Sequence, residues 1–170
     1  MSNVLKEIPV SPFNSAVELG FRSLVLLNES YPNQFSLRQL VVLDYLMVHS
    51  DDVSGGPDGL HPQTPYRSGE LLVRRESLQD GLLLFQSRGL ISKHFRPDGV
   101  LYSASETSDS FLDVMESQYY LRLRERAQWV DANFAQTNPE NLEQLVGSNL
   151  GRWGAEFEMA SVLWQESSNE

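Results

Sequence analysis

The polar residues that come closest to a metal-binding pattern lie together in the first half of the chain. They are His49, Asp51, Asp52, Asp58 and His61. A metal site needs fixed ligand geometry, which a rigid element usually provides. The spacing here matches neither a helical His-x-x-x-His pair nor a calcium-binding loop. We therefore predict no metal site and no resident cofactor, and an enzyme that uses a metal in this segment remains an alternative.

The same segment contains Gly55-Gly56-Pro57-Asp58-Gly59, whose glycines could suggest a phosphate-binding loop. It lacks the Gly-Lys-Ser/Thr ending and the strand-to-helix context of a P-loop, so a turn-rich linker is favoured. The chain has no Gly-x-Ser-x-Gly motif, and no grouping of Ser, His and Asp is spaced in a way that exceeds chance. We expect a protein without catalytic residues.

Basic side chains gather in and around the segment 67–96 and suggest contact with nucleic acid. In a winged helix, the second helix of the helix-turn-helix can enter the major groove while the hairpin, or wing, touches phosphate. The segment predicted as that helix carries Glu76 and Asp80, which would repel phosphate, so we expect backbone contacts without base readout. The candidate DNA-binding residues are Arg74, Arg75, Arg88, Lys93 and Arg96. A solvated basic rim paired with neighbouring acids is the alternative.

Composition limits the class of protein. A chain of 170 residues can build one sizeable core, so we predict a single domain over 1–170. The net charge of −10 argues against a surface that binds phosphate throughout. The chain has no cysteine, which excludes disulfides, thiolate zinc sites and cysteine nucleophiles. No apolar run is long enough to span a membrane, so we expect a cytoplasmic protein without a membrane partner.

The elements that must position these residues centre on Ser68–Ser105. Apolar residues with a helical period predict a short helix followed by a longer one. Two strand-like runs follow, joined by Arg96-Pro97-Asp98-Gly99, which favours a tight turn. The predicted fold is mainly α with a small β-hairpin, a winged helix-turn-helix core with additional N- and C-terminal helices. The period-forming residues are Leu71, Leu72, Leu78, Leu82, Leu83, Phe85 and Leu90.

Two further helices precede this core, after an N-terminal arm at 1–12. The first is predicted to begin at Asn14 as its N-cap and to place Val17, Phe21 and Leu24 on one face. The second, capped by Ser36, is apolar on most sides and should be central. The Asp44 carboxylate in this helix requires a hydrogen-bonding partner or a position on the one side of the helix that faces solvent. A long loop at 51–67 follows.

After the hairpin, apolar steps of three and four predict one long helix from near Ser110, or two helices split near Ser117. Asn138-Pro139 is a strong helix start and opens a C-terminal helical appendage at 138–170. The predicted stripe of the preceding helix is Leu112, Met115, Tyr119, Leu123, Ala127, Val130 and Phe134.

Two stretches that helical periodicity does not explain carry a family resemblance. They are HPQTPYRSGELLVRR at His61–Arg75 and NLGRWGAEF at Asn149–Phe157. With the segments around them, they resemble the middle component of bacterial ABC three-component systems, the group that includes the small accessory subunit of Lamassu-type defence. The resemblance extends over Phe13–Phe157.

The resemblance implies a non-catalytic adaptor that works with an SMC-like ATPase and an effector, commonly a nuclease, in defence against phage or plasmids. DNA contact through the complex is left open. We expect partner binding through Arg152, Trp153 and Phe157 first, and through Tyr66 and Arg67 second, because buried Trp and Arg dominate interface energies. Packing of Trp153 and Phe157 onto the core is an alternative. For function, the alternative is a stand-alone winged-helix DNA-binding regulator.

Overall fold

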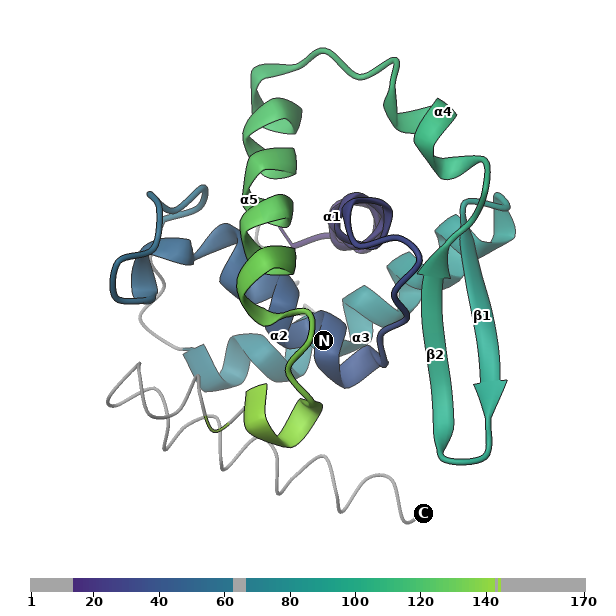
Figure 1. Ribbon diagram of the computed structural model, residues 1–170, viewed down its shortest axis with the longest axis horizontal. Helices are drawn as coiled ribbons and strands as arrows, with labels where there is room; N and C mark the ends of the chain where they lie inside the picture. Colours follow the sequence, from purple (N-terminus) through teal and green to yellow (C-terminus); the bar gives the residue numbers. More distant parts are fainter. Residues whose placement is uncertain (1–13, 63–66, 143, 145–170) are drawn as a thin grey trace, which may run out of the picture.

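The computed structural model describes residues 14–62, 67–142 and 144, with backbone alone for 67–73. This part of the chain is mainly helical and carries one antiparallel hairpin, as predicted (Figure 1). No helix in these ranges is both long and apolar enough to cross a bilayer. The elements are α1 (Ala16–Glu29), α2 (Leu37–Val48), the 3₁₀ turn η1 (Ser50–Asp52), α3 (Arg67–Ser87), β1 (Ile91–Arg96), β2 (Gly99–Ala104), α4 (Ser108–Leu112) and α5 (Gln118–Phe134).

Capping boxes fix the beginnings of α1 and α2. The Ser15 side chain accepts a hydrogen bond from the Glu18 backbone, and the Glu18 carboxylate accepts one from the Ser15 backbone. Ser36 and Gln39 make the same reciprocal pair at α2, which confirms Ser36 as the predicted cap. The prediction that Asn14 caps α1 is wrong by one residue. Each box satisfies backbone donors that a helix start would otherwise leave unpaired.

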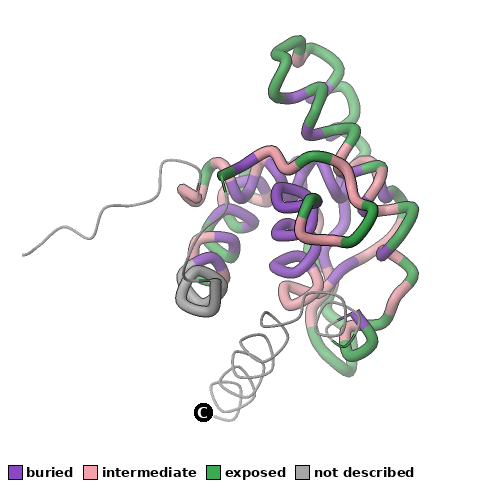
Figure 2. Tube along the Cα trace, turned by 90° about the vertical axis from the view of Figure 1, so that its left-hand side faces the viewer, coloured by how far each residue is buried: buried purple, intermediate pink, exposed green. Residues whose placement is uncertain are grey.

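Helix α2 lies at the centre of the described fold, as its apolar sequence predicted. Every residue from Leu40 to Val48 is buried. Figure 2 shows such buried residues concentrated in the middle of the traced chain, with exposed residues around them. Helix α1 is covered nearly as fully from Leu19 to Leu27, but Val17 is exposed, so its predicted inward position is wrong. One apolar cluster joins the buried residues of α1, α2, α3 and α5.

Helix α3 corrects the prediction of two helices between 68 and 90. Residues Arg67–Ser87 form one continuous helix of 21 residues, in which no proline interrupts the hydrogen-bond ladder. Leu78, Leu82 and Phe85 face the core as expected, whereas Leu83 is 63% exposed. After the helix, Gly89 takes a positive φ of 73°. The Leu90 N–H then bonds the Phe85 carbonyl at 3.0 Å, the pattern of a Schellman cap.

The hairpin follows the predicted turn closely. Arg96 is paired with Gly99, so Pro97 and Asp98 alone form the loop, and Gly99 has a φ of 141° that a residue with a side chain rarely adopts. A further bridge joins Phe35, between α1 and α2, to Tyr102 of β2 through bonds of 2.9 and 2.8 Å. The hairpin is therefore tied to the helical body at its base.

Beyond the hairpin, the alternative with two helices is the one observed. Ser117 caps α5, and its side chain accepts from the Tyr120 N–H at 3.1 Å. Most of the predicted stripe is buried, with Tyr119 partly exposed beside it. Asn138 accepts a hydrogen bond from the Asn141 N–H at 2.7 Å, which confirms it as a helix start. The rest of the C-terminal appendage, from 145, lies outside the described residues.

Helices α1 and α3 cross where two glycines face each other. A Cβ built on Gly81 would lie 2.3 Å from the Ala16 carbonyl oxygen and 2.6 Å from the Gly20 nitrogen. Both contacts are with backbone atoms, which a rotamer change cannot relieve. The absence of side chains at Gly20 and Gly81 therefore sets how closely the two helices pack.

We predict that Gly81→Ala lowers the free energy of unfolding. Alanine should gain about 1 kcal/mol of helix propensity. Overpacking against the α1 backbone should outweigh that gain and leave a net loss of about 1–3 kcal/mol in urea denaturation. Asp80→Ala, at the exposed neighbouring position of α3, is the control and should be nearly neutral. A stabilised Gly81→Ala protein would contradict the close crossing.

Candidate functional site

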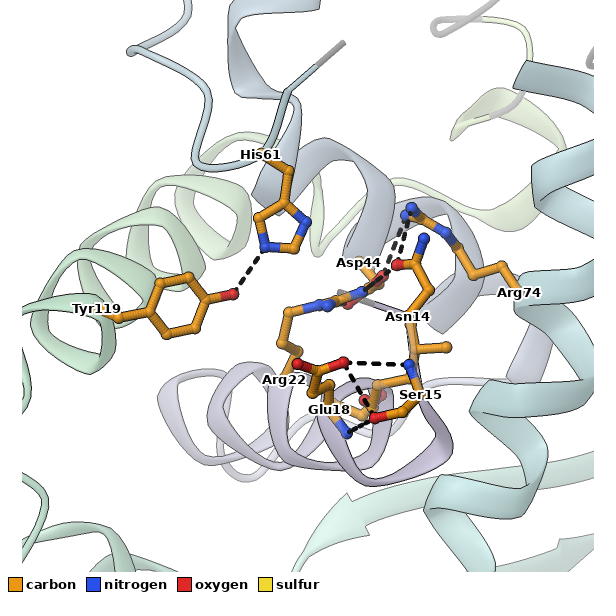
Figure 3. Close-up of polar contacts among 10 residues, drawn as sticks. Asn14, Ser15, Glu18, Arg22, Asp44, His61, Arg74 and Tyr119 are labelled. Carbon is orange, nitrogen blue, oxygen red and sulfur yellow. Dashed lines mark hydrogen bonds and ion pairs between the residues drawn. The ribbon is translucent and has the colours of Figure 1, made fainter. Parts of the chain in front are cut away.

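The most concentrated group of polar side chains in the described fold is buried between α1, α2 and α3. Asp44 receives two hydrogen bonds from Arg22, from Nε to Oδ1 at 2.7 Å and from Nη2 to Oδ2 at 2.9 Å (Figure 3). Arg74 Nη1 donates to the same Oδ2 at 3.2 Å. The three side chains are 1%, 0% and 1% exposed for Arg22, Asp44 and Arg74. The prediction that Asp44 needs a partner is confirmed.

Asn14 completes this cluster from the residue before the α1 cap. Its Oδ1 accepts from Arg22 Nη2 at 3.3 Å and from Arg74 Nη2 at 3.4 Å. The side chain that was expected to cap α1 thus bridges two guanidinium groups. One carboxylate and one amide oxygen thereby connect three helices through side chains alone.

The ionisation of the cluster follows from competition between burial and charge. Burial raises the pKa of Asp44, but the charges of Arg22 and Arg74 outweigh it, so this pKa lies below its ordinary value. Burial lowers the pKa of Arg22, and the Asp44 charge and hydrogen bond more than reverse that effect. Asp44 and Arg22 are therefore charged at neutral pH. Buried pairs of this kind contribute little net stability, yet removal of one partner is strongly destabilising.

His61 and Tyr119 form a second polar pair beside the cluster. The His61 Nε2 and Tyr119 Oη atoms lie 2.9 Å apart (Figure 3). Burial, together with the positive charge of Arg22, lowers the pKa of His61 to about 4, so the imidazole is neutral at pH 7. Burial raises the pKa of Tyr119, which keeps its phenol protonated. A neutral ring nitrogen and a phenol can share a hydrogen bond without a net charge.

The long segment after α2 folds back to position His61. The N–H groups of Leu60 and His61 both donate to the Val48 carbonyl, at 2.9 and 3.2 Å. Ser50 Oγ donates to the Asp58 carbonyl at 3.1 Å, and Tyr45 Oη donates to Asp52 Oδ2. Within the described ranges, no group of three or more His, Asp and Glu side chains could hold a metal ion.

A small cavity lies where α1 meets the start of α5. It has a volume of about 190 Å³ and is lined by Glu18, Phe21, Arg22 and Tyr119. Tyr119 is 42% exposed, so the walls reach the surface. Sequence reasoning missed this site and the role of Arg22. The available signal was an arginine within the apolar first helix and a carboxylate within the apolar second helix, a combination that indicates a buried ion pair.

The predicted DNA-binding residues separate into different environments. The expectation that Arg74 lies on the basic rim is wrong, because it is buried and bound to Asp44. Arg75 is half-buried, whereas Arg88, Lys93 and Arg96 are exposed. The Lys93 Nζ atom lies 5.3 Å from the Phe95 ring centroid, and Arg96 Nη2 donates to Gln34 Oε1 at 3.1 Å. DNA binding by the exposed residues stays a prediction.

Most of the predicted partner-binding residues are not among the residues that the structure describes. Arg152, Trp153, Phe157 and Tyr66 lie outside the described residues, and Arg67 is the first residue of α3. Their role stays a prediction.

We predict that Asp44→Asn destabilises the fold severely. The variant would leave two buried guanidinium groups facing a neutral amide, so the free energy of unfolding should fall by about 3–5 kcal/mol. Urea denaturation monitored by circular dichroism measures the change. Asp80→Asn makes the same replacement at an exposed position of α3 and should stay within about 0.5 kcal/mol of wild type. Equal stability of the two variants would disprove the role given to Asp44.

We also predict that acid weakens the fold through His61. Its pKa is about 4 in the folded chain, against 6.5 for an unperturbed imidazole. Between these values the unfolded chain binds more protons, so the free energy of unfolding should fall as pH is lowered, by on the order of 2 kcal/mol in total. The free energy of unfolding should depend less steeply on pH in His61→Asn than in His94→Asn, the control that also removes one imidazole. Equal pH dependence in the two variants would exclude His61 as the source of the acid sensitivity.

Comparison with known proteins supplies the remaining observation. A family described as ABC-three component (ABC-3C) system Middle Component 2 matches residues 12–156, which is most of the chain. The comparison with curated proteins found no match, nor did the comparison with solved structures. The matched range includes every helix and strand described above and the buried Arg22–Asp44–Arg74 cluster. The chain therefore belongs to the ABC three-component system Middle Component 2 family.

Proposed function

We propose that the protein is a non-catalytic adaptor that links an SMC-like ABC ATPase to an effector, such as a nuclease, in bacterial defence against phage or plasmids. The proposed setting is the cytoplasm, in a system of the Lamassu type. The observation that carries the proposal is the family match over residues 12–156, because a middle component of a three-component system has protein partners.

The distribution of exposed apolar side chains supports an adaptor. Phe95, on the projecting hairpin, is 77% exposed and stands opposite Val100 in the strand register. Val17 of α1 is 57% exposed and precedes the cavity residue Glu18 in the sequence. In Figure 1, α1 lies between α5 and the hairpin. An adaptor needs at least two binding surfaces, and exposed apolar side chains such as Phe95 and Val17 can contribute to them.

The order of the elements supports a winged-helix interpretation of the fold. Three helices precede a hairpin, and the Phe35 bridge adds a short third pairing beside β2. In this interpretation α3 is the recognition helix and the hairpin is the wing. The outward side of α3 carries Glu76, Asp80 and Leu83, all exposed, which suits neither phosphate nor base edges. We therefore favour a scaffold that binds proteins.

A second candidate, the DNA-binding regulator, rests on the exposed side chains of Lys93, Arg96 and Arg88 around the hairpin. These residues can contact phosphate without reading sequence. In the adaptor, the same rim would hold DNA within the complex. The net charge of −10 makes DNA binding by the isolated chain the weaker candidate.

We predict that the full-length chain co-purifies with an SMC-like ABC ATPase of the same system when the two are produced together. Replacing Trp153 and Phe157 together by Ala should weaken this assembly by about tenfold or more, because aromatic anchors dominate interface energies. Calorimetric titration of the purified components measures the affinity.

The matched control replaces two exposed apolar residues elsewhere, Leu83 and Val114, by Ala, and should assemble normally. Normal assembly of the Trp153/Phe157 variant would disprove the interface assigned to these residues. The regulator would be favoured over the adaptor if the wild-type chain did not bind the ATPase and the isolated chain bound DNA with sequence specificity.

A further inference from the structure

The cavity between α1 and α5 is a feature of the described fold that neither packing nor the buried ion cluster accounts for. Its volume of about 190 Å³ is below the roughly 300–1,000 Å³ of sites for drug-sized ligands. A space of this size matches a single amino-acid side chain. Phe21 and Glu18 are half-buried and Tyr119 is partly exposed, so a side chain from outside can reach it.

The lining combines two aromatic rings with a carboxylate. Phe21 and Tyr119 supply the rings, and Glu18 supplies the charge. Glu18 Oε2 accepts from the Ser15 N–H at 3.1 Å and from Ser15 Oγ at 3.0 Å. Among the hydrogen bonds of the described residues, Glu18 Oε1 accepts none. One carboxylate oxygen thus fixes the Glu18 side chain in position, while the other can accept a hydrogen bond from a bound side chain (Figure 3).

The charge of the remaining lining residue is balanced within the core. The Arg22 guanidinium makes two bonds to Asp44 and one to Asn14, and it also bonds the cavity residue Tyr119. Arg22 and Arg74 together carry two positive charges, and Asp44 and Glu18 carry two negative ones. Of these four, only Glu18 is not fully buried. A cation that enters meets the carboxylate first.

We propose that this cavity binds one arginine side chain from a protein partner of the complex, a proposal that rests on the adaptor function. A guanidinium plane stacks on aromatic rings, and its edge makes charge-assisted bonds to a carboxylate. An acidic side chain would be repelled by the Glu18 carboxylate, and an aliphatic one would displace water from it without supplying a hydrogen-bond donor. The acidic chain, with its net charge of −10, attracts a basic partner surface.

Glu18→Gln tests the proposal, because Gln at this position preserves the capping box while the charge is lost. In the co-produced complex, the variant should bind its partner at least about tenfold more weakly. Glu125→Gln, which neutralises an exposed carboxylate on α5, should bind as wild type. Equal thermal stability of the two variants would show that the fold is intact. Wild-type affinity in Glu18→Gln would overturn the proposal.

A direct titration separates this proposal from the adaptor function. N-acetyl-arginine methylamide added to the isolated full-length chain should shift the NMR signals of Phe21 and Tyr119 saturably. The norleucine analogue should not, and Glu18→Gln should abolish the arginine response. Absence of any arginine-specific shift would overturn the cavity assignment even if the complex assembles. A wild-type chain that binds arginine but no ATPase would overturn the adaptor function and leave the arginine site in place.

Discussion

The fold depends on one buried carboxylate that two arginines share. Asp44 lies in the most apolar helix of the described chain, and its charge is balanced by Arg22 from α1 and Arg74 from α3. Such a group fits only one arrangement of three helices, because any sliding would leave a charge in the core without its partner. The glycine crossing of α1 and α3 brings the arginines within reach. Burial of apolar surface is the main source of stability for the described core, and the ion cluster adds charged contacts from α2 to α1 and α3.

Sequence patterns revealed the elements better than the contacts between them. The Pro97-Asp98 turn, the Ser36 cap and the central position of α2 follow from local rules, and all three are observed. The division of α3 into two helices failed, because no proline separates the two predicted segments and the helix continues through both of them. Arg74 was assigned to the surface because basic side chains are usually exposed. The sequence shows that position 74 is an arginine, but only the tertiary structure shows which carboxylate its side chain contacts.

The candidate site shows the same limit. A partner for Asp44 could be anticipated because a charge in an apolar helix requires one. The pairing of His61 with Tyr119 joins residues far apart in sequence, and no spacing rule predicts it. The family resemblance indicated a protein that works through its partners, and the family match over residues 12–156 agrees with that class.

The pairing of Phe35 with Tyr102 has a mechanical consequence. A hairpin joined to a domain only by its two ends can swing as a flap, but β2 is also bonded to the connection between α1 and α2 through two backbone hydrogen bonds. A load applied at the tip near Phe95 would be carried along the strands into that connection, and from there into both helices. The hairpin and the helical body would then move together as one rigid unit.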